Sequence, residues 1–389
     1  MNAIHATLPG DNPRRTESIL SAARSRVLVL LCVAAALGCS GSSNNTGGGG
    51  GGTTQTATPA IATTAAQGGA QIVTLSDSTS GATIYFTLDG STPTVNSPQY
   101  FAPLLIASNE TLQAAALASG DTISQVASQT FSPNIASGTL VWSDEFSNST
   151  TANAQPNPST WTYDTGAGGW GNEELETYCS WGSSTSPCSA ANPNAYVGTD
   201  GYLHIVAQQP SAGVYTSARL KTQGLFSFMY GRIEASMQIP EGQGLWPAFW
   251  MLGSNIATVN WPACGEQDIM EHIDAPVPDW VAGSVHGTNL NLTTDFPATS
   301  GQTFSASDWH TYGMIWTKGQ IQYYIDSPSN IYATYTPSSQ SGATWPFDSG
   351  SGAFIILNLA VGGNWPGSPN SVTPFPSQLL VDYVRIYTN

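Results

Sequence analysis

Residues 232 to 239 read Arg-Ile-Glu-Ala-Ser-Met-Gln-Ile, and their apolar and polar side chains alternate strictly. Successive side chains of a β-strand point to opposite faces, so the apolar residues at 233, 235, 237 and 239 share one face. Residues 353 to 361, Ala-Phe-Ile-Ile-Leu-Asn-Leu-Ala-Val, are almost continuously apolar, as expected of a strand that is covered on both sides. Together the two patterns predict two β-sheets packed face to face.

The composition of the whole chain agrees with an all-β protein. Forty Gly, 25 Pro and very few Lys disfavour long helices and favour strands joined by turns. At 389 residues the chain exceeds the usual span of one hydrophobic core. We therefore expect two folded units, a small Ig-like β-sandwich over 59–133 and a β-jelly-roll sandwich over 138–389.

The first 58 residues have the features of an export leader and a linker. Four arginines precede the apolar run from Val27 to Leu37, which is too short to span a bilayer but suits a signal peptide over residues 1–39. Residues 36–39, Ala-Leu-Gly-Cys, resemble a bacterial lipobox. The Gly-rich residues 40–58 read as a flexible linker. We expect an exported protein, either secreted or held at the bacterial surface by a lipid on Cys39, its only membrane contact.

Three cysteines lie beyond the leader and linker. In an oxidising compartment Cys179 and Cys188 are expected to close a small disulfide loop. Cys264 is then left over, and we interpret it as a buried thiol that acts as a small hydrophobe.

The first folded unit carries a recognisable strand and turn. Residues 82–94 read Ala-Thr-Ile-Tyr-Phe-Thr-Leu-Asp-Gly-Ser-Thr-Pro-Thr, in which Asp-Gly supplies the turn. With Tyr100 and the later run Leu-Gln-Ala-Ala-Ala at 112–116, this segment resembles the small sandwich module of chitobiases and other bacterial glycosidases. The module contains no Trp, which favours a spacer over a sugar-binding face, although both roles remain open.

Charge limits the class of partner. The net charge is −16, and nine Lys and Arg are too few to neutralise a nucleic acid or an anionic membrane. A neutral polymer is compatible with this charge. All twelve Trp fall at or after residue 142, and exposed aromatic rings can stack on sugars without any charge.

Four of the carboxylates crowd into residues 266–274, in a chain of which only 9% is charged. In a regular strand Glu266 and Asp268 point to one face and Glu271 to the other. A bulge of one residue at Ile269 or Met270 would bring all three carboxylates to the same face. The uneven spacing therefore predicts a bulged strand.

Three carboxylates on one face suit the hydrolysis of a glycosidic bond. Leaning side chains could bring Glu266 and Glu271 to about 5 to 6 Å, the separation that retaining glycosidases use. Carboxyls this close cannot all ionise freely, so at least one pKa must rise, and a general acid needs such a proton at neutral pH. A solvated turn, a zinc site and a calcium loop fit less well, because the strand is half apolar, His272 faces away and no EF-hand spacing occurs.

Residues 266–271, Glu-Gln-Asp-Ile-Met-Glu, resemble the Glu-x-Asp-x-x-Glu signature of glycoside hydrolase family 16, of the laminarinase type. Supporting matches run through the second unit at residues 142–146, 171–174, 217–219, 244–251, 310–312, 357–367 and 381–385. The resemblance implies a retaining double displacement in a jelly-roll fold. Glu266 would be the nucleophile, Glu271 the acid and base, and Asp268 the neighbour that tunes their protonation.

The resemblance also implies residues around the catalytic set. Those expected to contact the sugar are Trp246, Trp250, Asn172, Arg219, His286 and Trp365. Many family members bind a structural calcium, for which the matching ligands are Asp382 and backbone oxygens near Glu145 and Gly201. No cofactor is expected for the chemistry itself. Each of these residues has a structural alternative, such as a core ring for Trp250 or a strand-end carboxylate for Asp382.

We therefore expect a monomeric endo-β-1,3-glucanase that acts on laminarin-like glucans, with tolerance for mixed β-1,3-1,4 linkages. The alternatives are a glycan-binding protein without turnover, a family member acting on another β-glycan such as lichenan or agarose, and a transglycosylase.

Overall fold

The structure is a computed structural model that describes residues 54–147, 150–274, 279–297 and 304–389. The expected signal peptide, the lipobox cysteine Cys39 and most of the expected linker lie outside these residues. Within the described residues, no helix has the length and apolar character needed to cross a membrane.

The first described unit is a pair of three-stranded sheets. They enclose a small core that includes Val73, Phe86 and Leu112. One sheet has the order β1-β2-β4 and the other the order β3-β5-β6. The bounds are β1 Ala60–Ala65, β2 Gln71–Ser76, β3 Thr83–Thr87, β4 Leu104–Ile106, β5 Glu110–Leu117 and β6 Ala127–Phe131, with a short 3-10 helix η1 at Gln67–Gly69.

The end of the expected linker is part of this first unit. The N–H of Thr56 donates to Thr122 O across 3.0 Å, and the Thr56 hydroxyl accepts the N–H of Ala118. Thr56 is also buried. Residues 54–58 were expected to be flexible and are instead hydrogen-bonded to the module, because their Thr side chains satisfy backbone groups there.

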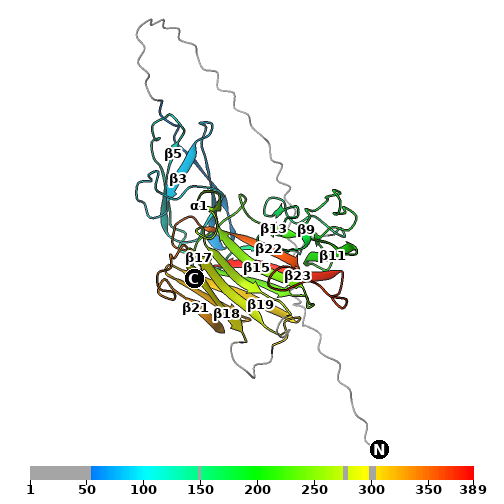
Figure 1. Ribbon diagram of the computed structural model, residues 1–389. Helices are drawn as coiled ribbons and strands as arrows, with labels where there is room; N and C mark the ends of the chain where they lie inside the picture. The colour runs from blue at the N-terminus through cyan, green and yellow to red at the C-terminus, as the bar shows by residue number, and fades with distance from the viewer. Residues whose placement is uncertain (1–53, 148–149, 275–278, 298–303) are drawn as a thin grey trace, which may run out of the picture. The chain divides into compact units, whose positions relative to one another are not determined.

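The second unit is a sandwich of a ten-stranded and a seven-stranded sheet. The larger follows the order β21-β20-β19-β14-β23-β11-β12-β9, with β10 and β7 pairing at its sides; the smaller follows β18-β17-β16-β15-β22-β13-β8. In Figure 1, β19 and β23 mark the larger sheet and β15 and β22 the smaller. The all-β class and the jelly-roll sandwich expected from the sequence are confirmed.

The strands of the larger sheet are β7 Leu140–Asp144, β9 Glu176–Tyr178, β10 Ala195–Val197, β11 Leu203–Ser211, β12 Val214–Ser217, β14 Gly231–Gln238, β19 Trp309–Thr317, β20 Gln320–Ile325, β21 Ile331–Tyr335 and β23 Ser377–Tyr387. Those of the smaller sheet are β8 Thr162–Asp164, β13 Arg219–Lys221, β15 Leu245–Gly253, β16 Glu266–Glu271, β17 Val281–Gly287, β18 Leu290–Phe296 and β22 Ala353–Val361. A one-turn helix, α1 Ile256–Val259, lies between β15 and β16.

Both sequence patterns that predicted sheets are found in this core. In β14 the residues Ile233, Ala235 and Met237 are fully buried, and every residue of β22 is buried. Strand β22 pairs with β15 along its whole length, and β15 in turn pairs with β16. The most covered strand of the sandwich thus supports the strand that carries the carboxylates.

Cys264 lies just before β16 and is a buried free thiol, as expected. Its burial and the charge of Glu266 raise the thiol pKa to about 11. Cys264 therefore remains protonated at neutral pH and has little nucleophilic character.

Candidate active site

Strand β16 contains the bulge that the sequence predicted. Against β15, Asp268 pairs with Trp250 and Met270 with Phe249, so Ile269 has no partner. Against β17, Asp268 pairs with Ser284 and Glu271 with Ala282, which again leaves an extra residue in β16. Ile269 and Met270 are both buried. The displaced residue is therefore Ile269, and Glu271 is brought back to the face of Glu266 and Asp268.

The three carboxylates line one cleft on the outer face of the seven-stranded sheet. The cleft has a volume of about 330 Å³ and is lined also by four tryptophans, at positions 170, 246, 250 and 261. Phe249 and Met251 of β15 point the other way, into the core, whereas Trp246, Ala248 and Trp250 face the cleft. The alternation of one strand thus provides both a core face and an aromatic cleft wall.

Crowding and burial favour the protonated form of two of the carboxyls. Burial, followed by the negative charge of Glu266, raises the pKa of Asp268 well above its usual value. Burial, followed by the charges of Asp268 and Glu266, does the same to the pKa of Glu271. The shift favours the protonated form of Glu271, which is the form that a general acid requires.

Each carboxylate has its own polar partner. The indole N–H of Trp261 donates to Glu266 Oε2, and that of Trp246 donates to Glu271 Oε1 across 3.2 Å. His286 lies opposite Glu266 in the register of β16 and β17, and its Nε2 is 3.1 Å from Asp268 Oδ2. The hydrogen bond from Trp246 favours the charged form of Glu271 and so limits the rise of its pKa.

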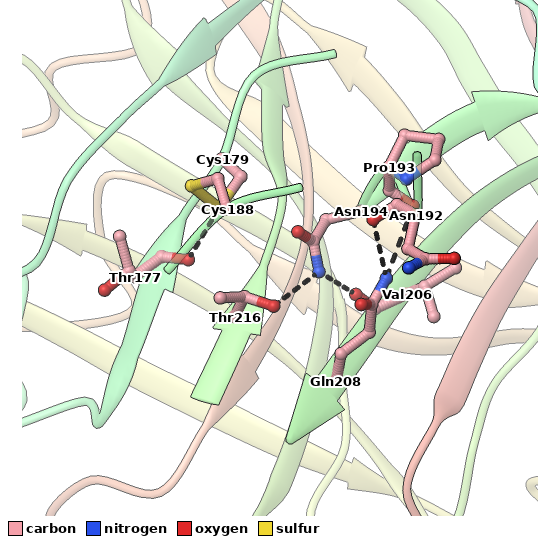
Figure 2. The surroundings of a disulfide bond; sticks show 9 residues. All are labelled: Thr177, Cys179, Cys188, Asn192, Pro193, Asn194, Val206, Gln208 and Thr216. Carbon is pink, nitrogen blue, oxygen red and sulfur yellow. Dashed lines mark hydrogen bonds between the residues drawn. A yellow bond between two sulfur atoms is a disulfide. The ribbon is translucent and has the colours of Figure 1, made fainter. Parts of the chain in front are cut away.

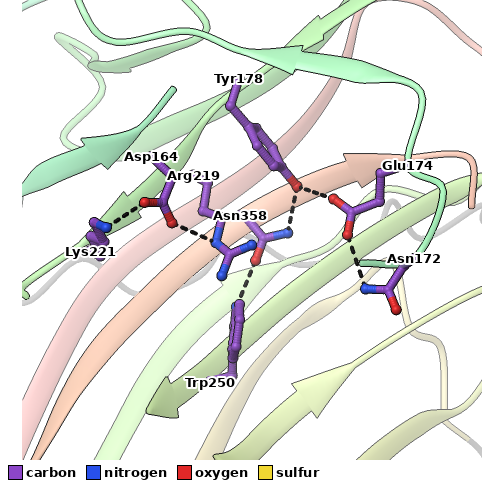
Figure 3. Close-up of polar contacts among 8 residues, drawn as sticks. All are labelled: Asp164, Asn172, Glu174, Tyr178, Arg219, Lys221, Trp250 and Asn358. Carbon is purple, nitrogen blue, oxygen red and sulfur yellow. Dashed lines mark hydrogen bonds and ion pairs between the residues drawn. The ribbon is translucent and has the colours of Figure 1, made fainter. Parts of the chain in front are cut away.

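A chain of hydrogen bonds forms the floor of the cleft beside the carboxylates. Figure 3 shows it running from Asn172 through Glu174, Tyr178 and Asn358 to Trp250. Asn172 Nδ2 donates to Glu174 Oε1 across 3.1 Å, and the Tyr178 hydroxyl donates to Glu174 Oε2 across 2.9 Å. Asn358 Nδ2 donates to the Tyr178 hydroxyl, and the Trp250 indole donates to Asn358 Oδ1 across 2.7 Å. These bonds fix the orientation of the Trp250 ring.

Arg219 packs between aromatic rings at the same end of the cleft. Its guanidinium carbon lies 4.5 Å from the ring centre of Trp250 and 5.5 Å from that of Trp170. Its Nε is 3.1 Å from Asp164, which also forms an ion pair with Lys221. The cation is thus paired with a carboxylate and held beside the rings, where it can still offer N–H groups to a ligand.

Glu176 lies behind this floor and is completely buried. Its Oε2 accepts the N–H of Val361 across 2.7 Å, whereas its Oε1 has no hydrogen-bond partner among the described residues. Burial, followed by the charge of Glu174, raises the pKa of Glu176 to about 9. Glu176 therefore holds a proton at neutral pH.

The structure brings most of the expected sugar-contacting residues to the cleft. Trp246, Trp250, Asn172 and Arg219 line it. His286 and Trp365 do not line it directly. His286 contacts Asp268, and Trp365 is 40% exposed with its ring edge-on to Trp246 at 5.2 Å. Both residues thus contact side chains that line the cleft.

Sequence reasoning did not single out four residues that line the cleft, namely Trp170, Glu174, Trp261 and Asn358. Each lies inside a matching segment or within five residues of an assigned one, so proximity to a motif was the available signal. Trp170 has a φ of +47°, a left-handed conformation that is rare for a bulky residue. Such backbone strain is often found at functional sites.

Among the described residues, the side chains grouped closely enough to hold a metal ion are Glu266, Asp268 and His286, of which the two carboxylates line the cleft. The expected calcium ligands lie elsewhere. Asp382 is in β23, whose register places Val381 opposite Leu203 and Val384 opposite Asp144. The Glu145 side chain is occupied by two hydrogen bonds from Arg385, at 2.9 and 2.7 Å, so only its backbone oxygen remains available there.

A disulfide joins Cys179 to Cys188 directly after β9 (Figure 2). Cys179 follows Tyr178, whose hydroxyl belongs to the hydrogen-bond chain of the cleft floor. Strand β9 has three residues and lies at the end of its sheet, paired with β12 and, at Tyr178, bridged to Gly166. The disulfide thus closes a loop on the short strand that carries Tyr178.

Comparison with known proteins agrees with this geometry. Residues 183–385 match the family of glycosyl hydrolases 16, and residues 62–128 match the chitobiase/beta-hexosaminidase C-terminal domain. The chain is 40% identical over 261 residues to the beta-glucanase of Rhodothermus marinus, covering 64% of this chain and 84% of that one. It is 34% identical over 283 residues to glucan endo-1,3-beta-glucosidase A1 of Niallia circulans, of which it spans only 38%.

A solved structure gives the same result. The endo-β-1,3-glucanase from Pyrococcus furiosus superposes with a TM-score of 0.55 and 38% identity, over 64% of this chain and 94% of that chain. The superposed share of this chain is about the length expected for the second unit alone. With the family matched over residues 183–385 and its signature carboxylates gathered on a bulged strand, the chain belongs to glycosyl hydrolase family 16 and is a glycoside hydrolase.

Proposed function

We propose that the protein cuts internal β-1,3-glucosidic bonds of laminarin-like glucans, with net retention of configuration at the anomeric carbon. The observation that carries this proposal is the gathering of Glu266, Asp268 and Glu271 in one cleft by the bulge at Ile269. The named activities of the relatives favour β-1,3-glucan as the substrate.

The reaction proceeds in two displacements. In the first, Glu266 attacks the anomeric carbon while Glu271 donates its proton to the departing glycosidic oxygen, which leaves a covalent glycosyl-enzyme. In the second, Glu271 takes a proton from water, which attacks the same carbon and releases Glu266. The raised pKa of Glu271 supports its role as the acid of the first step.

The cleft walls suit a neutral sugar chain. Four tryptophans provide apolar faces, and the hydrogen-bonded pair Asn172 and Glu174, together with Arg219, provides polar groups for hydroxyls. Mixed β-1,3-1,4 glucans are neutral chains of sugar rings and hydroxyls, as laminarin is. We therefore include them as slower substrates.

The experiment incubates the protein with laminarin and measures new reducing ends. We expect large oligosaccharides first, a β-anomer as the first product by NMR, and a lower rate on lichenan. Agarose should not be cut. If the protein bound laminarin without releasing reducing ends, its function would be glycan binding and not hydrolysis. If it formed longer chains from oligosaccharides, it would be a transglycosylase.

The proposal includes a structural calcium ion at Asp382. This carboxylate is partly exposed and has no hydrogen-bond partner among the described residues, and burial raises its pKa, so a cation would stabilise its charged form. Carboxylate and backbone oxygens, here near Glu145 and Gly201, are the ligands that calcium prefers. Chelator should lower the Tm of the wild type more than that of Asp382→Ala, and equal shifts would remove the ion from the proposal.

The proposal also places the protein outside the cytoplasm, as a monomer. The disulfide between Cys179 and Cys188 supports an oxidising compartment. The apolar run before Cys39 supports export, with or without a lipid anchor. Labelling with a radioactive fatty acid and fractionation of producing cells would distinguish a lipoprotein from a secreted enzyme.

A further inference from the structure

A second groove, far from the carboxylates in the fold, lies on the outer face of the ten-stranded sheet. In β11 the residues Leu203, Ile205 and Ala207 point into the core, so Val206 and Gln208 point outward. The outward residues of β11 form one side of a groove of about 390 Å³. The cleft, by contrast, is on the outer face of the other sheet.

The groove lining is unusual for so acidic a chain. It contains no Asp, Glu, Lys, Arg or His, although the chain carries 25 acidic residues. Two other surface hollows in the described residues do include carboxylates, Glu110 in one and Asp144 with Glu145 in the other. An uncharged lining does not favour an ionic ligand.

Side-chain amides take the place of charges. Five line the groove, from Asn153, Asn192, Gln208, Gln209 and Gln378. An amide both donates and accepts hydrogen bonds, as a sugar hydroxyl does. The polar part of this lining therefore matches a neutral polyol.

Some of these amides are fixed and others are free. Gln208 Nε2 donates to the carbonyl oxygen of Asn192 across 3.1 Å, and Figure 2 shows this contact. Gln378 Oε1 lies 2.7 Å from His204 Nδ1, which leaves the amide N–H groups of Gln378 available. The side chains of Asn153, Asn192 and Gln209 form no hydrogen bond with other described residues. The groove thus combines oriented amides with unused ones.

Braced rings complete the lining. Tyr196 is stacked on His204 with ring centres 4.5 Å apart and planes 11° apart. Phe375 packs against Tyr215 at 5.2 Å. Both Tyr196 and Phe375 remain partly exposed. Rings held in place by neighbours lose little freedom on binding, and their faces suit the C–H faces of a pyranose.

We propose that this groove binds a second segment of neutral β-glucan without cutting it. The identity of the ligand rests on the proposed function, because the groove by itself specifies only an uncharged polyol. A polymer held at both the cleft and the groove has a high effective concentration at the cleft. A short oligosaccharide that occupies only the cleft gains nothing from the groove.

Kinetics on long and short substrates test this role. The double variant Tyr196→Ala, Gln209→Ala should raise KM for laminarin by about threefold or more. Its kcat/KM for a β-1,3-tetrasaccharide should stay within about twofold of the wild type. Gln322→Ala, an amide on the same sheet outside the groove, should change neither value. Equal KM values for laminarin in the double variant and the wild type would overturn the proposal.

A binding measurement checks the groove independently of turnover. Inactive Glu266→Ala protein is run through a gel containing laminarin, with the cleft saturated by the tetrasaccharide. We expect retardation, and its loss when Gln209→Ala and Tyr196→Ala are added, singly or together. Unchanged retardation in these variants would overturn the proposal that the groove binds glucan. If the wild type instead fails to hydrolyse laminarin, the proposed function fails, whatever the gel shows.

Discussion

The indole Nε1 of Trp246 donates a hydrogen bond to Glu271 Oε1 across 3.2 Å. The ring is fixed by Trp365, which meets it edge-on at 5.2 Å, and Trp365 in turn packs edge-on against Trp280 at 5.9 Å. Trp246 therefore both lines the cleft and orients the general acid. Its N–H opposes the effect of burial and of Asp268, which raise the pKa of Glu271.

Replacing Trp246 with Phe should move the alkaline limb of the kcat/KM profile to higher pH. The variant keeps an aromatic face but loses a hydrogen bond that favours charged Glu271, so the pKa of the acid rises further and its proton persists to higher pH. Loss of such a bond, about 1.5 to 3 kcal/mol, should lower kcat/KM by about tenfold or more. Trp250→Phe is the matched control, because its N–H donates to Asn358. If the alkaline limb moved equally in both variants, the Trp246 hydrogen bond would not be what controls the pKa of Glu271.

Removing the nucleophile should allow chemical rescue. Glu266→Gly should reduce hydrolysis by about 10⁴-fold or more, and added azide should restore turnover of an activated β-glucoside by entering the space left by the carboxylate. The product should be the α-azide, since azide then attacks from the side of the missing group. Glu271→Gly should give the β-azide instead, because Glu266 still forms the covalent intermediate. NMR of the products reads both outcomes, and the same anomer from both variants would contradict the assignment.

The sequence could predict the bulge but not the partners of its carboxylates. Glu266, Asp268 and Glu271 are spaced by two and then three, and this spacing forces one residue out of register wherever the strand lies. The contact between His286 and Asp268 depends on the register of β16 with β17, which the sequence between these two residues does not reveal. Likewise, the N–H groups of Trp246 and Trp261 reach carboxylates through ring orientations that no sequence pattern specifies.

Contacts between distant segments account for the other residues that the sequence missed. Asn358 is in the middle of β22 and reads as part of an apolar run, yet its amide joins Trp250 to Tyr178. Glu174 lies on a loop that meets β22 only in the folded chain. No local pattern marks such a meeting, because the pairing of β15 with β22 comes from tertiary structure.

The buried Glu176 should make stability fall as pH rises. Burial and the charge of Glu174 raise its pKa from the ordinary value of 4.5 to about 9, so the folded state binds the proton more tightly than the unfolded chain between these values. The contribution of Glu176 to the free energy of unfolding is complete below about pH 4.5 and is lost as the pH rises to about 9. Glu176→Gln removes the titration but keeps an acceptor for the N–H of Val361.

Tm measured from pH 4.5 to 9.5 checks the effect of Glu176. The variant should equal the wild type at the acid end and exceed it by a few degrees at the alkaline end. Activity should remain, because Glu176 does not line the cleft. Glu174→Gln is the companion variant, since Glu174 does line the cleft and should also change KM. Parallel Tm profiles for wild type and Glu176→Gln would show that Glu176 is not protonated in the folded state.

Breaking the disulfide should loosen the cleft floor as well as destabilise the fold. A loop that spans nine positions, from Cys179 to Cys188, restricts the unfolded chain by about 2 to 3 kcal/mol, so Cys188→Ser should lower the Tm markedly. Because Cys179 directly follows Tyr178, the bond from Tyr178 to Glu174 should also weaken and KM should rise.

Reductant provides the internal comparison for the disulfide. It should bring the Tm of the wild type down to that of Cys188→Ser and leave the variant unaffected. Cys264→Ala removes a buried thiol that is not in a disulfide, so it should stay as sensitive to reductant as the wild type. If Cys188→Ser lowered the Tm while reductant left the wild type unchanged under unfolding conditions, packing of the Cys188 side chain would explain the loss. A fall in Tm without a change in KM would separate the stability of β9 from the orientation of Tyr178, and would leave Asn172 as the residue that holds Glu174.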